Sequence, residues 1–101
     1  MPRTIEPYRL SPKARNDLEG IWRYIYETWS LRQADTYHAQ LVAAFERLAE
    51  NPQLGRSVDH LRPGYLRHSV GSHFVFYRLG QHQAIEIVRI LHQRMDFRRH
   101  L

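Results

Sequence analysis

The sequence has no cysteine, which excludes disulfide bridges and metal sites built on thiolates. No apolar run approaches the ~20 residues that cross a membrane, and the N-terminus MPRTIEPYRL has no apolar core of the signal-peptide kind. These absences favour a cytoplasmic protein without a membrane contact. A chain of 101 residues can bury one core without covalent staples, so we expect a single domain over residues 1–101.

Motifs of catalysis and metal binding are scarce as well. The histidines at 60, 68, 73, 82, 92 and 100 show no i, i+4 pairing on a helix, which argues against a metal site. Gly64, Gly71 and Gly80 stand at predicted turns, which leaves no glycine-rich phosphate loop. No Ser-His-Asp arrangement can be singled out either. We therefore expect neither a metal nor a cofactor.

Basic charge is abundant, but it is unevenly placed. Residues 1–50 carry seven basic and seven acidic side chains, whereas residues 51–101 carry eight arginines against Asp59, Glu86 and Asp96. The second half thus holds the whole net charge of +5. This asymmetry favours an acidic partner, either nucleic acid or an acidic protein segment, over a merely solvated basic surface.

The first half of the chain predicts a short strand and two helices. Tyr8–Leu10 is the strand, with Ile5 as a candidate extension. Ser11-Pro12 is a helix start, and helical spacing of apolar residues continues to Thr28 or Trp29. A capping-box pattern over residues 30–33 begins a second helix, which we expect to end near Asn51-Pro52. So short a link predicts an antiparallel helical hairpin.

The second half predicts a loop over residues 52–65 and then three strands. The strands are Leu66–Val70, His73–Leu79 and Ala84–Leu91, and one helical turn follows near Asp96–Leu101. The last two strands flank the polar link Gly80–Gln83, which indicates a hairpin. The third strand is apolar on both faces, which predicts an interior position in the sheet. Its alternation places Ile85, Ile87 and Leu91 on one face and Ala84, Val88 and Ile90 on the other.

The predicted fold is therefore α+β, in the order β-α-α-β-β-β, with the helical hairpin packed on a small, mainly antiparallel sheet. Arg67, Arg78 and Arg89 lie on three successive strands, and His92 follows the last of them. One hypothesis is an RNA-cleaving site, in which an arginine stabilises transition-state charge and His92 serves as general acid or base. The alternative is a surface paired with carboxylates, which the lack of a second catalytic residue beside His92 favours.

A surplus of aromatic residues on the first helix suggests a second site. Trp22, Tyr24, Tyr26 and Trp29 cannot all face one way at 100° per residue, so at least one lies near solvent. Such residues are good interface anchors. A tyrosine with only its hydroxyl in water is an equally good account of the pattern.

Four blocks of sequence carry a family resemblance. YRLSPKARNDLEGIWRYI, AFERLAENPQLGR, LRPGYLRHSVGSHFVFYRL and IEIVRILHQRMD together resemble the ParE toxins of bacterial type II toxin–antitoxin modules, within the wider RelE/ParE superfamily. The resemblance implies growth arrest by inhibition of DNA gyrase, with neutralisation by a ParD-like antitoxin. It implies no catalysis and no sequence-specific DNA binding by the toxin alone.

The same resemblance suggests which residues meet each partner. The antitoxin would contact the aromatic residues Trp22, Tyr26 and Trp29 and the sheet arginines Arg67, Arg78 and Arg89. The basic C-terminal segment would face gyrase, with the candidates Arg94, Met95, Arg98 and Arg99. On this basis we expect that Arg94→Ala, or removal of Met95–Leu101, lowers toxicity while the fold survives.

The RelE branch of the superfamily provides the alternative function, a ribosome-dependent endoribonuclease that cuts messenger RNA. In that case Arg67 and Arg89 would match basic positions of the site, and His92 would act as the C-terminal acid or base. The sequence departs from that pattern in two ways. Its only lysine is Lys13, at the start of the first helix, and no tyrosine follows the last strand.

Overall fold

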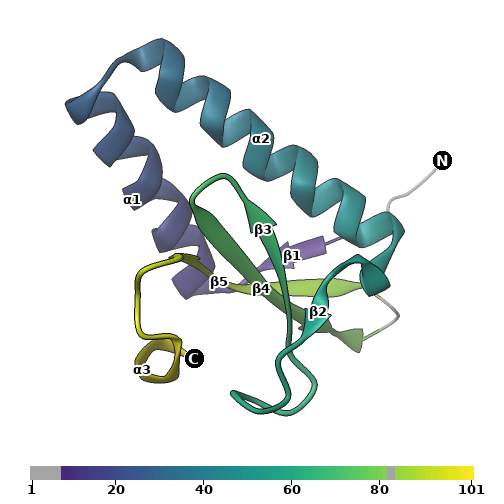
Figure 1. The fold of residues 1–101 in the computed structure, drawn as a ribbon. Coiled ribbons are helices and arrows are strands. Elements are labelled where there is room, and N and C mark those ends of the chain that lie inside the picture. The colour runs from purple at the N-terminus through teal and green to yellow at the C-terminus, as the bar shows by residue number, and fades with distance from the viewer. Residues whose placement is uncertain (1–7, 82–83) are drawn as a thin grey trace, which may run out of the picture.

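The computed structural model describes residues 8–81 and 84–101, and it confirms the predicted order of elements (Figure 1). A short strand, β1 (Tyr8–Leu10), leads into the helices α1 (Pro12–Thr28) and α2 (Leu31–Glu50). Strands β3 (Leu66–Val70), β4 (His73–Leu79) and β5 (Ile85–His92) follow, and the chain ends with α3 (Phe97–His100). The predicted link Gly80–Gln83 is only partly within the described residues, and Ile5 and His82 lie outside them.

Hydroxyl caps set both helix starts, as the sequence predicts. The side chain of Ser11 accepts a hydrogen bond from the Ala14 backbone N–H, and Ser30 does the same for Gln33. The hairpin packs on one face of the sheet with an apolar stripe that includes Leu18, Leu41 and Phe45. Ala34 and Ala44 are fully buried on α2, where small side chains allow close approach.

The sheet has five strands in the order β1-β5-β4-β3-β2, where β2 is Arg56–Ser57, so β5 is an interior strand, as predicted. Strands β3, β4 and β5 pair in antiparallel fashion, whereas β1 runs parallel to β5 along its first residues. The fifth strand, β2 (Arg56–Ser57), lies within the segment 52–65 that we predicted to be a loop. That segment also contains one 3-10 turn, η1 (Pro52–Leu54). A strand of two residues is too short to give an alternation signal.

The predicted facing of β5 is wrong beyond its midpoint because the strand contains a β-bulge. Phe76 pairs with Arg89 and Tyr77 with Ile87, so Val88 is the extra residue. After it the alternation is reversed: Ile90 joins Ile85 in the core under the helices, and Leu91 packs on the opposite face. The freed Val88 carbonyl accepts a hydrogen bond from the Ser11 hydroxyl at 2.7 Å, which ties the start of α1 to the bulge.

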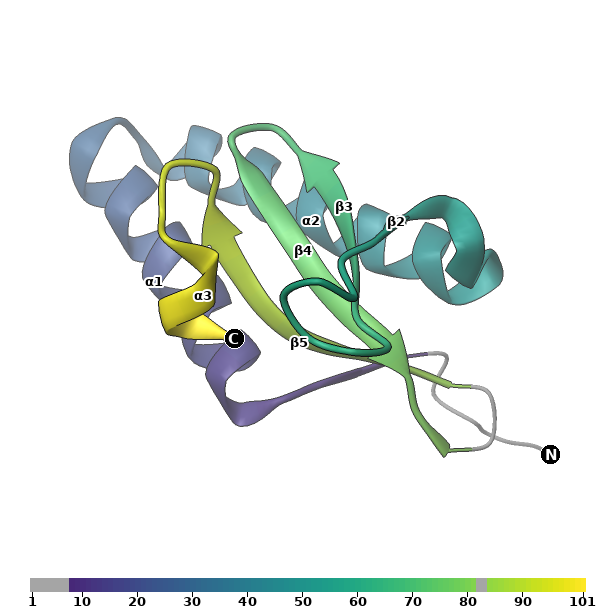
Figure 2. The same ribbon diagram turned by 60° about the horizontal axis from the view of Figure 1, so that its bottom comes forward.

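A second, smaller core covers the other face of the sheet. Val58, Phe76 and Leu91 are buried there, under the loop that follows β2 and under α3. Phe97 of α3 stacks edgewise on Phe74 and Phe76, with ring centroids 5.5 and 5.0 Å apart. Figure 2 shows this loop and α3 in front of the strands, with the helical hairpin behind them. The sheet is therefore covered on both sides.

Candidate functional site

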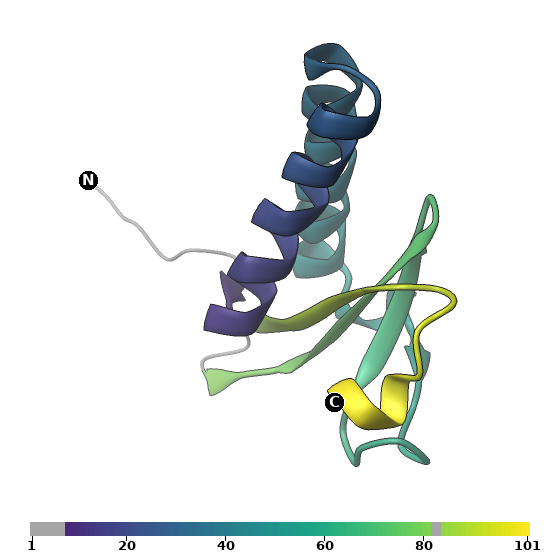
Figure 3. The ribbon, with the colours of Figure 1, turned by 90° about the vertical axis from the view of Figure 1, so that its left-hand side faces the viewer.

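A groove of about 820 Å³ opens between the helical hairpin and the end of the sheet where β4 begins and β5 ends. In Figure 3 the hairpin extends well past the strands, and the β3–β4 turn leans away from it, so the two form the arms of a V. Residues of α1 and α2 line one arm. Ser72, His73, Ile90, Leu91, His92 and Met95 line the other.

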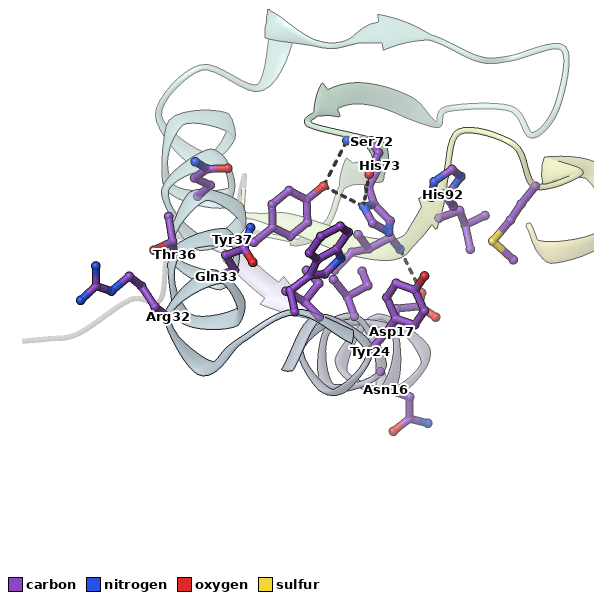
Figure 4. A pocket seen from close by; sticks show the side chains of 18 residues that line it. Asn16, Asp17, Tyr24, Arg32, Gln33, Thr36, Tyr37, Ser72, His73 and His92 are labelled. Atoms are coloured by element: carbon purple, nitrogen blue, oxygen red, sulfur yellow. Dashed lines mark hydrogen bonds between the residues drawn. The ribbon is translucent and has the colours of Figure 1, made fainter. Parts of the chain in front are cut away.

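The rim of the groove is aromatic and exposed. Tyr24 and Trp29 line the groove from the helices with 65% and 68% of their surfaces in water. Below them the wall is apolar, with Ile21 and Ile25 on α1 and Ile90 on β5. Arg32 extends outward at the edge of the groove (Figure 4). Exposed rings above an apolar wall are typical of a protein-binding groove in its unbound form.

A polar network anchors the groove where α2 meets the β3–β4 turn (Figure 4). The Tyr37 hydroxyl donates to the Val70 carbonyl at 2.9 Å and accepts from the Ser72 N–H at 3.2 Å. Its remaining partner is His73 Nδ1 at 2.7 Å, and because Tyr37 has one proton, Nδ1 carries the hydrogen of that bond. The turn depends on Gly71, whose φ is +55° and where a Cβ would lie 2.7 Å from the Tyr37 ring.

This environment keeps His73 neutral. Burial is the main cause that lowers its pKa, to about 4, and the neighbouring His92 adds to the effect, while Asp17 opposes it. The His73 and His92 rings meet edge to face with centroids 5.3 Å apart. His92 accepts a hydrogen bond at Nδ1 from the Arg94 N–H. The floor of the groove therefore has the two imidazoles and the Tyr37 phenol side by side, and Asp17 of α1 also lines the groove.

Arg89 is held in an internal ion pair and is not part of a free surface. Its Nε and Nη2 donate to Asp17 of α1 at 2.8 and 3.0 Å, and both side chains are about 15% exposed or less. The same Asp17 accepts the Ile90 N–H, and Arg89 Nη1 donates to the His100 carbonyl. These hydrogen bonds to Asp17 raise the pKa of Arg89. Arg89 thus joins α1, β5 and the C-terminal segment.

The residues of the nuclease hypothesis do not converge. Arg67 lies over the Phe74 ring at 4.2 Å, Arg89 is engaged by Asp17, and His92 faces the groove beside His73. Side chains alternate along β4, so His73 and Val75 lie on the face of the sheet that carries the helices, whereas Phe74 lies on the opposite face. Arg67 and His92 are therefore on opposite sides of the sheet. Among the residues that the structure describes, no three metal-ligating side chains come together either.

The predicted antitoxin contacts fall on three separate surfaces. Trp29 lines the groove. Trp22 donates to Asp35 of α2 at 2.9 Å and stacks on Tyr26 at 5.2 Å, and neither ring lines the groove. Arg67 and Arg78 lie over rings of the opposite sheet face, where Arg78 also pairs with Glu86.

The predicted gyrase contacts also divide. Met95 lines the groove, whereas Arg94, Arg98 and Arg99 are exposed around α3. No signal in the sequence pointed to Tyr37 or Asp17. Tyr37 occupies an apolar position of the helical pattern, and Asp17 lies 72 residues from the arginine that it binds.

Comparison with solved structures finds the same architecture. A chain of the structure titled "Chromosomal ParDE TA system from P. aeruginosa" superposes with a TM-score of 0.72 at 18% identity, over 84% of this chain and 92% of that chain. The helical hairpin packed on the five-stranded sheet is therefore a small α+β domain with the fold of that chain. Within the described residues no helix is long and apolar enough to cross a membrane.

Sequence comparison then establishes the family. A family model described as "ParE toxin of type II toxin-antitoxin system, parDE" matches residues 8–97. Toxin ParE1 of Mycobacterium tuberculosis is 48% identical over 93% of this chain and 96% of its own length. Toxin ParE1 of Caulobacter vibrioides is 46% identical over 96% and 99%. This chain belongs to the ParE toxin family of type II toxin–antitoxin systems.

Proposed function

We propose that this ParE-family toxin arrests growth by binding DNA gyrase in the cytoplasm, without catalysis of its own, and that a ParD-like antitoxin neutralises it. The observation that carries the proposal is an open, aromatic-rimmed groove in place of a convergent catalytic set. A groove of this kind suits the binding of a protein segment. The endoribonuclease alternative needs Arg67, Arg89 and His92 around one substrate, and their separation speaks against it.

The antitoxin segment, in this proposal, fills the groove with an amphipathic helix. The apolar wall and the exposed Tyr24 and Trp29 would bury its apolar side, and the Arg32 guanidinium at the rim would pair with its carboxylates. Trp22 and Tyr26 then serve the hairpin itself, because Trp22 already bonds to Asp35.

The antitoxin proposal is tested by calorimetry with the ParD-like product of the neighbouring gene. Trp29→Ala should weaken binding at least tenfold, as expected for an aromatic anchor worth about 1.4 kcal/mol or more. Leu31→Ala is the matched control, since Leu31 is 53% exposed at the hairpin tip but does not line the groove. Equal effects of the two substitutions would remove the groove from the interface.

The gyrase proposal is tested in a supercoiling and DNA-cleavage assay with purified gyrase. We expect inhibition by the wild-type toxin, reversal by the antitoxin, and intact transcripts after brief expression in cells. Arg94→Ala and Arg98→Ala should reduce inhibition, because both side chains are exposed and make no ion pair within the described residues. Normal supercoiling together with cut messenger RNA would support the endoribonuclease instead.

A further inference from the structure

Four arginines gather on the face of the sheet opposite the helical hairpin, and we call them the basic face: Arg56, Arg62, Arg67 and Arg78. Arg56 of β2 and Arg67 of β3 are direct partners in the antiparallel register. Side chains at such positions point to the same side and lie close together, so two like charges there destabilise the pair. Neither guanidinium makes an ion pair among the described residues.

Aromatic rings lie against three of the four guanidinium groups. The Arg67 guanidinium carbon lies 4.2 Å from the centroid of Phe74. Arg62 and Arg78 each lie 5.9 Å from the centroid of Tyr65. Arg62 also donates to the Leu101 carbonyl at 2.9 Å. Arginines fixed in this way lose little conformational entropy when they bind an anion.

The carboxylates of this half of the chain do not neutralise the face. Asp59 accepts the Gly64 N–H in the loop and makes no ion pair among the described residues, and Asp96 caps α3 through the Arg98 N–H and pairs with Arg99. Glu86 pairs with Arg78 alone, and that pair is exposed. Three of the four guanidiniums therefore keep their charge available to a ligand.

The basic face is separate from the groove. None of its four arginines lines the groove. Arg56, Arg67 and Arg78 belong to strands β2, β3 and β4. Arg62 belongs to the loop after β2, which Figure 2 shows in front of the strands, with the hairpin behind them. A partner in the groove therefore leaves the basic face open.

We propose that the basic face binds the phosphodiester backbone of duplex DNA without sequence specificity. Its guanidiniums come from four separate segments, which suits a linear polyanion better than a single small anion. Guanidinium groups already lie against Phe74 and Tyr65, so neither of these rings is a free platform for unpaired bases, and backbone contact to a duplex is favoured over single strands. The inference complements the gyrase proposal, since gyrase acts on duplex DNA.

The test is fluorescence anisotropy with a labelled duplex of about 20 base pairs, titrated with the toxin over a series of salt concentrations. The variant Arg56→Gln/Arg67→Gln should bind at least tenfold more weakly, and its slope of log K against log salt should be shallower by about 1.8. The control Arg15→Gln/Arg23→Gln removes the same charge from exposed positions of α1 and should change affinity less than about twofold. Circular dichroism verifies that both variants fold.

Several outcomes overturn the proposal. Equal losses in the two variants would show attraction by net charge alone. Tighter binding of a single strand of the same sequence, or of an acidic peptide, would assign the face to another partner. Absence of duplex binding even at low salt would show that the face is not a DNA-binding surface. The titration contains no gyrase, so its failure leaves the gyrase proposal intact, and a toxin inert against gyrase can still bind DNA.

Discussion

At the scale of single residues, two ion pairs of equal length lie in different surroundings. Arg89 and Asp17 are 2.8 Å apart with side chains 14% and 15% exposed, and Arg78 and Glu86 are 2.8 Å apart with side chains 50% and 32% exposed. Asp17→Asn leaves a largely buried guanidinium without its counter-charge, so we expect a loss of about 2–4 kcal/mol in the free energy of unfolding. Glu86→Gln should cost less than about 1 kcal/mol.

Urea denaturation of the two variants at neutral pH measures this difference. The substitutions are chemically identical in kind, so the exposure of the pair is the main variable. Similar midpoints for both variants would mean that Asp17 contributes little beyond a surface contact, contrary to its three hydrogen bonds.

His73 gives the molecule a pH dependence of stability. Its pKa is depressed to about 4, so between pH 6.5 and about 4 the unfolded chain takes up a proton that the folded chain does not. Stability is therefore complete above pH 6.5 and falls as the pH is lowered through this window. The full shift would correspond to roughly 3 kcal/mol, but solvent screening of this part-buried group reduces the expected loss to about 1–2 kcal/mol.

The measurement compares urea denaturation at pH 7 and pH 4.5 for the wild type and for His73→Asn. Asparagine keeps a donor for the Tyr37 hydroxyl but does not titrate, so the variant should lose less stability on acidification. Parallel losses in both proteins would assign the pH dependence to other groups.

At the scale of elements, the sequence predicted what local signals encode. Ser11, Ser30 and Pro52 determine helix ends through hydrogen bonds and φ restrictions that need no distant partner. The bulge at Val88 has no such signal, because it arises where β5 must pair with β4 and also accept the N-terminus of α1. The prediction therefore found the strand and misplaced Ile90 and Leu91 on its faces.

The C-terminal segment is part of the second core, which changes the expectation for its removal. Phe97 and Leu101 pack with Phe74 and Phe76, and the His100 carbonyl binds Arg89. We now expect removal of Met95–Leu101 to destabilise the fold, because it uncovers this cluster. Phe97→Ala alone should cost about 2–4 kcal/mol, since the ring is half-buried and not completely enclosed.

Thermal unfolding distinguishes this packing role from a contact with gyrase. Arg94→Ala removes an exposed side chain of the same segment and should leave the melting temperature within about 2 °C of the wild type. If Phe97→Ala also melts like the wild type, α3 does not contribute to stability. Removal of Met95–Leu101 would then test the role of this segment in toxicity without unfolding the protein.

At the scale of the whole molecule, the candidate site depends on contacts between residues far apart in the chain. The Tyr37–His73 bond spans 36 positions and the Asp17–Arg89 pair spans 72. Hydrophobic periodicity indicates that Tyr37 is buried but not what its hydroxyl meets. The charge asymmetry of the sequence predicts an excess of basic side chains in the second half of the chain. Only the β2–β3 register, however, places Arg56 beside Arg67, and only the fold buries Arg89 against Asp17.

The two surfaces should act independently, because the sheet separates them. Trp29→Ala should weaken antitoxin binding at least tenfold and leave the affinity for duplex DNA unchanged within about twofold. Arg56→Gln/Arg67→Gln should do the reverse. When the groove and basic-face substitutions are combined in one protein, their effects on each binding free energy should add within about 0.5 kcal/mol. Calorimetry measures the antitoxin affinity and anisotropy measures the DNA affinity. Coupling above that value would mean that a partner in the groove also reaches the basic face or moves the strands that carry it, and the toxin–antitoxin complex would then bind DNA more weakly than the free toxin.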